Sequence, residues 1–264
     1  MFGVKRSLIL IGLMLLPRVA AAQEPRQPLQ ELFLTEVVYP QEKGETQLTL
    51  RVLVDRARPE RSALIPLSIE YGLTDRWQVG AGWDGYTQFH DSPFGNLRSA
   101  RASIGTKYSV MNIKGSPVHA AVGVDVEFPD AGAFPDDEGE TGVEADTFIA
   151  LAADLGRGVT LFGSGGLSLE SRAATALFKN GERPDSPGTA SFGALLALGR
   201  ATVAIEYTNR SDGLPWRLEG SPLVTPSLVF HPGHKWELAA GIAFPIRGEH
   251  RHPAGFAMNV IKEF

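Results

Sequence analysis

The sequence contains no cysteine, which excludes a disulfide framework, a thiolate zinc site and a cysteine nucleophile. It also lacks an excess of positive charge. The 25 Lys and Arg residues face 30 Asp and Glu for a net charge of −5, so the electrostatic footprint of nucleic-acid binding is missing. Hydrophobic residues make up 43% of the chain, too many for a disordered protein. The 29 glycines and 18 prolines disfavour a helical bundle.

Residues 1–22 have the features of a secretory signal peptide. Lys5 and Arg6 give a positive start, an apolar run follows over residues 8–16, and three alanines precede Gln23. The apolar run would be about 14 Å long as a helix, half of a ~30 Å membrane core, so it is too short to be a membrane anchor. We therefore expect cleavage after Ala22 and export, with no later run long enough for a transmembrane helix.

From Gln47 onward, hydrophobic and polar residues alternate with the period of a β-strand whose two faces differ. The clearest case is residues 118–128, where valines on one face alternate with His119, Asp125 and Glu127 on the other. No amphipathic helix interrupts the pattern. It predicts about twelve strands, over residues 47–54, 63–71, 77–85, 100–108, 118–128, 143–155, 159–169, 190–198, 201–207, 224–230, 236–244 and 256–260.

The connections between these segments alternate in length along the chain. The short ones are residues 73–76, 109–116, 156–158, 199–200 and 231–235. A barrel of the bacterial outer membrane has short periplasmic turns, longer external loops and an even number of strands. A soluble β-sandwich gives no reason for such alternation, since both of its ends face the same solvent. The sequence therefore predicts an all-β fold: a transmembrane, antiparallel, up-and-down β-barrel over residues 45–264, in the bacterial outer membrane.

Aromatic residues gather near the ends of the predicted strands, mostly on the apolar face. Two girdles of rings at the headgroup levels are typical of a barrel in contact with outer-membrane lipid. The periplasmic girdle comprises Tyr71, Trp77, Tyr108, Phe230, Trp236 and Phe264, and the external one Trp83, Phe128, Tyr207, Phe244 and Phe256. The alternate apolar series ending at Phe264 also resembles the C-terminal signal that the barrel-insertion machinery binds, with Lys262 as a departure.

Two prolines and the N-terminal region do not follow from this pattern. Pro66 and Pro226 lie inside predicted strands, where each removes a ladder hydrogen bond. A bulge, a position without a partner or a boundary error would explain them. Residues 23–44 include a short apolar run at 37–39. They are a periplasmic segment, a plug in the lumen or a strand that docks a periplasmic partner.

Residues 69–80 read IEYGLTDRWQVG: a strand, a tight turn and a strand that restarts on an aromatic residue. This stretch resembles the repeated hairpin of the outer-membrane proteins grouped as the MetA-pathway phenol degradation family. The resemblance implies a barrel that moves aromatic or other hydrophobic compounds across the outer membrane.

The predicted lumen face carries many more acids than bases. The bases are Arg51, Arg101 and Lys107, and the acids are Glu70, Asp84, Asp125, Glu127, Glu144, Asp146, Asp154, Glu170, Glu206 and Glu237. Rings of carboxylates at a pore mouth favour cations. The direction of each strand places some of these side chains near the external mouth. The candidate lumen and mouth residues are Asp84, Asp125, Glu127, Glu144, Asp146, Glu170 and Arg101.

Other roles for these acids stay open. They can pair with loop arginines such as Arg98, Arg172 or Arg183, or hold a structural calcium ion. The acidic loop at residues 130–140 lacks the spacing of a calcium-binding motif, however. Small inward residues such as Gly105, Gly123 and Gly241 leave room for a narrow passage unless the N-terminal segment fills it.

An enzyme is the less favoured alternative. Residues 206–213 resemble the His-x-Ser-Asn-Gly stretch of outer-membrane phospholipase A, but Asn209 stands in place of the histidine and Asp212 in place of the asparagine. Without an imidazole, the Ser211 hydroxyl has no activating base, and a turn-like composition explains the stretch. The pairs His231/His234 and His250/His252 lie on opposite sides of a ~25 Å apolar band, so they cannot share a metal.

We therefore predict no catalytic residue, no metal and no cofactor. The expected function is an outer-membrane channel or transporter for small solutes, hydrophobic or aromatic ones included. A closed barrel that serves as a scaffold for a periplasmic partner bound at residues 23–44 is the main rival.

Overall fold

The computed structural model describes residues 32–33, 35–55, 62–88, 98–129, 143–170, 188–211, 222–233, 235–246 and 255–264. The predicted signal peptide over residues 1–22, its cleavage after Ala22 and residues 23–31 lie outside these ranges. So do most residues of the long connections, including the acidic loop at 130–140.

Twelve β-strands make up the barrel, and each coincides with a segment of alternating apolar and polar residues. They are β1 (Thr46–Asp55), β2 (Ser62–Thr74), β3 (Trp77–Gln88), β4 (Arg98–Val110), β5 (Val118–Pro129), β6 (Glu144–Gly156), β7 (Val159–Glu170), β8 (Gly188–Leu198), β9 (Ala201–Ser211), β10 (Leu223–Gly233), β11 (Trp236–Pro245) and β12 (Gly255–Glu263). Every predicted strand is present. The largest boundary error is in β9, which was expected to end at residue 207 and continues to Ser211.

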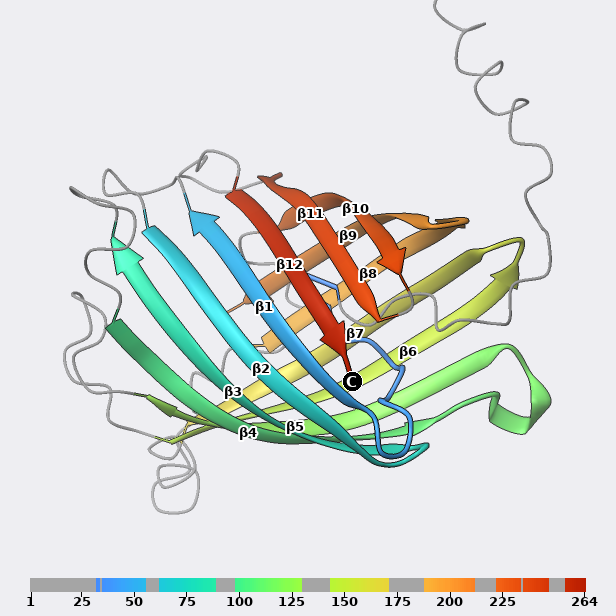
Figure 1. The fold of residues 1–264 in the computed structure, drawn as a ribbon, viewed down its shortest axis with the longest axis horizontal. Coiled ribbons are helices and arrows are strands. Elements are labelled where there is room, and N and C mark those ends of the chain that lie inside the picture. The colour runs from blue at the N-terminus through green and yellow to red at the C-terminus, as the bar shows by residue number, and fades with distance from the viewer. Residues whose placement is uncertain are drawn as a thin grey trace, which may run out of the picture.

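Each strand pairs antiparallel with its neighbours in the chain, and β1 also pairs with β12, so the sheet closes on itself (Figure 1). Leu50 in β1 lies opposite Val260 of β12 on one side and opposite Leu67 of β2 on the other. Closure removes the unpaired sheet edges that a lipid-exposed sheet cannot tolerate. The predicted antiparallel up-and-down barrel is confirmed.

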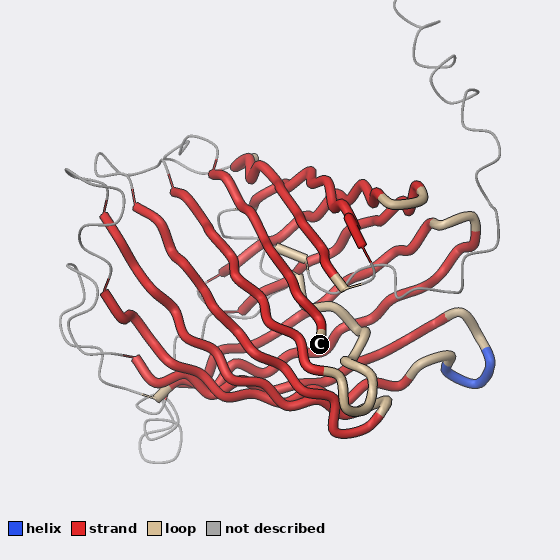
Figure 2. The backbone as a smooth tube through the Cα atoms, in the orientation of Figure 1, coloured by secondary structure: helices blue, strands red, loops and turns tan. Residues whose placement is uncertain are grey.

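Short turns lie at one end of the barrel and long connections at the other (Figure 2). We call these the short-turn end and the long-loop end; the sequence predicts the former to be periplasmic. At the β6–β7 turn, Gly156 (φ 79°), Arg157 (φ 55°) and Gly158 (φ 77°) have left-handed backbone, which tight hairpins require. The β4–β5 connection contains a short 3-10 helix, Ile113–Gly115. Among the described residues, no helix is long and apolar enough to cross a membrane.

The outer surface of the barrel is apolar over its whole circumference. The exposed large hydrophobic side chains include Leu50, Leu67, Ile104, Val122, Ile149, Leu151, Leu161, Phe192, Val203, Ile205, Leu228, Ile242 and Met258. Soluble monomers rarely expose a contiguous apolar patch of more than a few hundred Å². This exterior is therefore matched to lipid and not to water.

Aromatic side chains mark both rims of this apolar surface. Tyr71 and Trp77 near the short-turn end and Phe128 and Phe244 near the long-loop end are all more than 40% exposed. These positions agree with the predicted girdles. Lys262, the departure from the C-terminal pattern, places its ammonium group 4.8 Å from the centroid of the Trp236 ring. A cation–π contact of this kind keeps the charge at the rim of the barrel.

The two prolines inside strands lie where the ladder is locally interrupted. Pairing of β2 with β1 has a gap at residues 65–66, and pairing of β10 with β11 has a gap at residues 225–226. On its other side each proline stays in register with β3 or β9. Pro66 and Pro226 therefore occupy positions whose missing N–H group costs no ladder bond, which is one of the explanations considered above.

Candidate functional site in the barrel lumen

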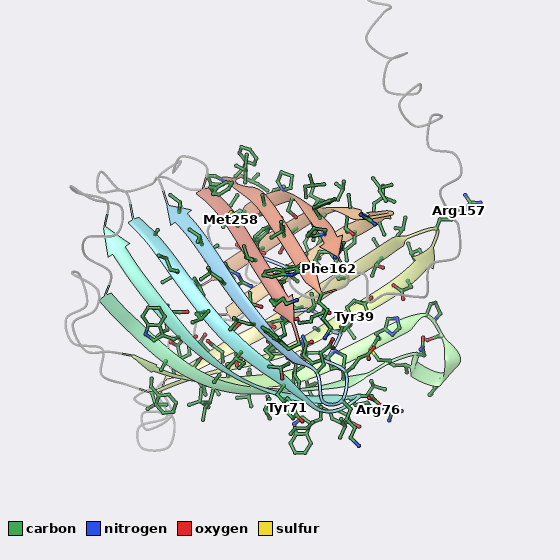
Figure 3. The ribbon with its side chains drawn as sticks, viewed as in Figure 1. Tyr39, Tyr71, Arg76, Arg157, Phe162 and Met258 are labelled. Carbon is green, nitrogen blue, oxygen red and sulfur yellow. The ribbon has the colours of Figure 1, made fainter. Side chains whose placement is uncertain are left out.

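The hydrophobic core of this protein lies inside the barrel. Residues 32–33 and 35–45, here called the inner segment, contribute five buried apolar or aromatic side chains to it: Leu32, Phe33, Val37, Val38 and Tyr39. These pack against small inward residues of the surrounding strands and against Phe162. Figure 3 shows Tyr39 and Phe162 within the ring of strands. The described part of region 23–44 thus lies against the lumen wall.

Hydrogen bonds tie the inner segment to strands on several sides of the lumen. The backbone N–H of Phe33 donates to Glu206 Oε1 of β9 at 3.3 Å, and the guanidinium of Arg51 in β1 donates to the carbonyl oxygen of Leu32 at 3.2 Å. Nearer the short-turn end, the backbone N–H of Gln41 donates to Gln78 Oε1 of β3 at 3.0 Å. The segment is therefore held by β1, β3 and β9.

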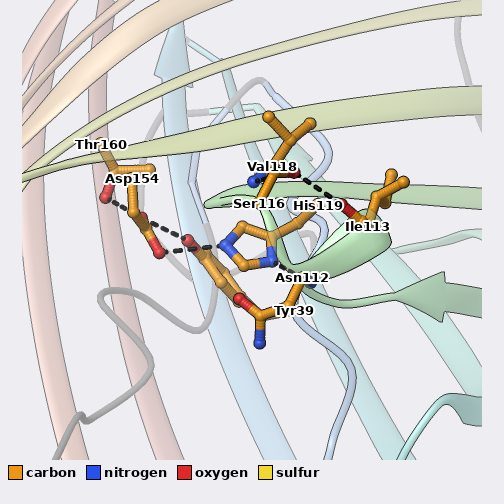
Figure 4. Close-up of polar contacts among 8 residues, drawn as sticks. All are labelled: Tyr39, Asn112, Ile113, Ser116, Val118, His119, Asp154 and Thr160. Atoms are coloured by element: carbon orange, nitrogen blue, oxygen red, sulfur yellow. Dashed lines mark hydrogen bonds and ion pairs between the residues drawn. The ribbon is translucent and has the colours of Figure 1, made fainter.

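A fourth attachment involves a buried histidine (Figure 4). The Tyr39 hydroxyl donates to Asp154 Oδ1 at 3.4 Å, and the Thr160 hydroxyl donates to the same oxygen at 2.7 Å. His119 Nδ1 accepts the backbone N–H of Asn112 at 3.0 Å, while His119 Nε2 lies 3.0 Å from Asp154 Oδ2. Because Nδ1 is an acceptor, the ring proton is assigned to Nε2, which donates to the carboxylate.

The predicted mouth residues meet on the strands that line the long-loop half of the lumen. Arg101 of β4 lies between two of the acids: its Nε is 3.1 Å from Asp84 Oδ2, and a terminal nitrogen pairs with Glu127. The acids were expected to pair with loop arginines if they had a structural role. Among the described side chains, the base that meets them comes instead from the wall itself.

Strand register brings the remaining predicted acids close to one another. Glu144 lies opposite Glu127 on one side and opposite Glu170 on the other, and Asp125 lies opposite Asp146. Asp146 also accepts a hydrogen bond from the Ser168 hydroxyl. For Glu170, only the backbone position is described.

Glu36 of the inner segment and Asp125 of β5 line the same cavity. The cavity has a volume of about 50 Å³, enough to hold water, and its lining includes Glu36, Glu70, Lys107, Asp125 and Phe148. Enclosure by the protein raises the pKa of the Glu36 carboxyl, and nearby carboxylates such as Glu70 raise it further, while Lys107 and Arg51 lower it. The ionised form of Glu36 is therefore less stable in the lumen than in water.

The lumen has two unlike walls. Strands β2–β6 form the charged wall, with inward Glu70, Asp84, Arg101, Lys107, Asp125, Glu127, Glu144, Asp146 and Asp154. Strands β8–β12 form the small-residue wall, whose buried inward side chains include Ser191, Leu195, Ala204, Thr225, Val229, Ala239, Ala257 and Asn259. Glu206 and Glu237 are the acids among the described buried residues of the second wall.

The inward glycines do not leave empty space. A Cβ atom added at Gly241 would lie 2.9 Å from the Phe33 ring, and one added at Gly123 or Gly193 would overlap the ring of Phe148 or Phe162. At Gly123 the expected room is taken by the Phe148 ring, and at Gly241 it is taken by Phe33 of the N-terminal region, which is the exception stated with that expectation. The glycines allow rings to lie flat inside the barrel.

Ser211, considered above as a nucleophile, ends β9 at the long-loop end. The described histidines, His119 in β5 and His231 in β10, lie near the short-turn end, the opposite end of the barrel. The described structure therefore supplies no imidazole beside Ser211. Residues 209–211 continue β9 instead of forming the expected turn. Among the described residues, no group of three or more His, Asp or Glu side chains is arranged to hold a metal ion.

Sequence patterns did not single out Glu36, Tyr39 and His119, although all three form contacts within the lumen. The apolar run at 37–39 was the signal available, and it did not show where the segment lies. His119 is one of the alternate residues of β5 that point into the lumen, so its position was predictable from the sequence. Its hydrogen bonds were not.

Taken together, the closed barrel, apolar exterior and polar lumen define the class: a barrel of the outer-membrane type. No model of a known protein family and no well-characterised protein matches the sequence. The MetA-pathway phenol degradation family is therefore not supported by such a match.

Solved structures match the fold. Two structures of the KdgM porin, one in complex with disordered oligogalacturonate, each have a TM-score of 0.56 and 8% identity, and the match covers 83% of this chain and 99% of that protein. Outer-membrane phospholipase A from Escherichia coli, as an active-site mutant, has a TM-score of 0.46 and 10% identity over 90% of this chain and 95% of that one. At such low identity the likeness to the KdgM porin shows the fold alone.

Proposed function

We propose that the protein is an outer-membrane channel for small solutes, with a preference for cations. The observation that supports this most is the charged wall. It brings the carboxylates of Asp84, Asp125, Glu127, Glu144 and Asp146 to the long-loop half of a closed barrel, beside Arg101. Carboxylates on a low-dielectric wall concentrate cations and repel anions.

The two walls also favour a class of solute. The charged wall attracts a positive group, and the small-residue wall accommodates an apolar ring, since Phe33 lies against Gly241 there. Small organic cations with an apolar or aromatic face match both walls. A purely hydrophobic solute would need a lateral route out between strands instead of an aqueous pore.

The experiment is a reversal-potential measurement on the purified full-length protein in a planar bilayer under a KCl gradient. We expect cation-selective openings. Selectivity should fall when Asp125→Asn, Glu127→Gln, Glu144→Gln and Asp146→Asn are combined. A unit charge contributes about 1 kcal/mol to an ion 4 Å away in water, so the permeability ratio should drop at least about fivefold.

The control is Glu42→Gln, which removes one acid from the exposed C-terminal end of the inner segment, at the short-turn end of the barrel. It should leave the permeability ratio unchanged. Anion selectivity in the unmodified protein, or equal effects of the wall and control variants, would refute the proposed role of the charged wall.

A further inference from the structure

The inner segment crosses the lumen and contacts its wall on opposite sides. Its hydrogen-bond partners are in β1, β3, β6 and β9, and Phe33 lies against Gly241 in β11. These strands are distributed around the whole barrel. A solute moving along the barrel axis would therefore meet the segment.

The contacts of the segment differ between the two walls. Phe33 and its apolar neighbours belong to one buried cluster, which contains Ala204, Val229, Ala239 and Ala257 of the small-residue wall and also Ala121, Ala150 and Ala152 of β5 and β6. Apolar burial of this kind favours the seated position.

Toward the charged wall, Glu36 shares a cavity with charged groups of both signs, among them Glu70, Asp125 and Lys107. The charged groups that act on it are Glu70 of β2, Asp125 of β5 and Asp146 of β6, opposed by Lys107 of β4 and Arg51 of β1. Like charges at close range disfavour the ionised form of each group. The seat is thus favoured by apolar contacts and by hydrogen bonds such as those to Glu206 and Arg51, and weakened by the charge on Glu36.

We propose that the inner segment is a gate that closes the channel, and that the charge on Glu36 sets how firmly the gate is seated. The inference rests on the proposed channel function. With Glu36 neutral, the apolar contacts hold the segment in place. With Glu36 ionised, the loss of water around the carboxylate and repulsion from Glu70 and Asp146, which together exceed the attraction of Lys107 and Arg51, favour release of the segment toward the short-turn end, where residue 45 joins it to β1.

The pH dependence follows from linkage. Outside the lumen the Glu36 carboxyl has its ordinary pKa of 4.5, and in the seated state its pKa is raised. The seated state therefore binds the proton more tightly. Seating is firmest below pH 4.5, weakens as the pH rises through the seated pKa, and does not change further above it.

A cysteine-accessibility experiment tests the gate directly, because the natural sequence contains no cysteine. Val38, which is only 2% exposed in the lumen, is replaced by cysteine, and its reaction with a hydrophilic maleimide is timed in proteoliposomes. Lys114→Cys in the exposed β4–β5 connection gives the rate for an open position. We expect Val38→Cys to react much more slowly than Lys114→Cys. Because every thiol reacts faster as the pH rises, the measured quantity is the rate for Val38→Cys divided by the rate for Lys114→Cys at the same pH, and this ratio should be higher at about pH 8 than near pH 6.

Charge variants then identify the group responsible. Glu36→Gln should slow labelling of Val38→Cys about tenfold at neutral pH and abolish the pH dependence of its rate relative to Lys114→Cys, whereas Lys107→Gln should accelerate labelling by a similar factor. The effect of Lys107→Gln should shrink when Glu36→Gln is also present, because the two groups interact. Glu42→Gln, in the same segment but outside the lumen, should change nothing.

The gate and the channel can fail separately. If Val38→Cys is labelled as fast as Lys114→Cys, the segment is not seated in the lumen. If Glu36→Gln and Lys107→Gln leave the labelling rate of Val38→Cys unchanged, charge does not control the gate. If labelling shifts as expected while every variant is silent in a bilayer, the movement of the segment stands and the channel function falls.

Discussion

The two walls of the lumen differ in composition and, on our account, in task. Inward positions on the charged wall include nine acidic or basic side chains, and two of the acids, Asp84 and Glu127, pair with Arg101. Inward positions on the small-residue wall are mostly alanine, valine, serine and threonine, buried under the inner segment. The difference separates two properties: the charged wall governs which solute enters, and the small-residue wall governs whether the lumen is closed.

The largest effect is expected from placing a charge on the small-residue wall. Ala239→Glu puts a carboxylate into the apolar seat of the inner segment, where Ala239 is 4% exposed. An unpaired buried ion costs several kcal/mol, so the segment should leave, and Val38→Cys should be labelled at the rate of an exposed residue. Ala243→Glu is the control, on the same face of β11 but nearer the long-loop end and outside the buried cluster. Slow labelling in Ala239→Glu would show that this wall is not the seat.

Removing the ring that rests on Gly241 comes next. Phe33→Ala should weaken seating by about 3 kcal/mol, roughly a hundredfold in the seating equilibrium. Frequency of opening in a bilayer and labelling of Val38→Cys should rise together. Phe192→Ala removes a ring from the outer surface, 58% exposed, and should affect neither. Equal responses of the two phenylalanine variants would contradict the assignment of the seat.

A change on the charged wall should alter selectivity and leave the gate in place. Arg101→Gln removes the base that pairs with Asp84 and Glu127, which leaves two acids without this partner. The gain for a cation is about 1 kcal/mol, or roughly a fivefold rise in the cation-to-anion permeability ratio. Labelling of Val38→Cys should stay as slow as before. A change in labelling without a change in reversal potential would mean that Arg101 acts on the gate and not on ion selectivity.

The smallest effect concerns a single long hydrogen bond. Tyr39→Phe keeps the ring beside His119 and removes the 3.4 Å bond to Asp154. Seating should weaken by at most about 1 kcal/mol, which is a few-fold increase in labelling. Tyr71→Phe on the outer surface is the matched control. A loss of seating as large as that in Phe33→Ala would mean that the hydrogen-bonded cluster, and not the apolar seat, holds the segment.

Much of the fold was predictable because a lipid-facing barrel repeats one local rule along the chain. The alternation at residues 118–128, the aromatic residues at strand ends and the alternating turn lengths are all local patterns, and each corresponds to a feature of the structure. The inward direction of Asp84, Arg101, Asp125 and Glu127 followed from the same period.

The contacts inside the lumen were not predictable in this way. Phe33 and Glu206 are 173 residues apart in the chain, and no local pattern links them. The glycines at positions 123 and 241 were expected to leave free space, whereas each lies beneath an aromatic ring, Phe148 of β6 and Phe33 of the inner segment respectively. The pairing of Arg101 with two acids depends on the register of three strands, which alternation alone does not fix.

The most direct test of the whole account is the bilayer conductance of a variant that lacks residues 24–44. Circular dichroism should first show that its strand content matches that of the full-length protein, since the twelve-strand ladder does not include these residues. The account predicts that the full-length protein opens briefly, whereas the shortened barrel conducts continuously and keeps its cation preference. A correctly folded shortened barrel with no greater conductance, and with loss of a co-purifying periplasmic protein, would contradict the account and favour a docking segment.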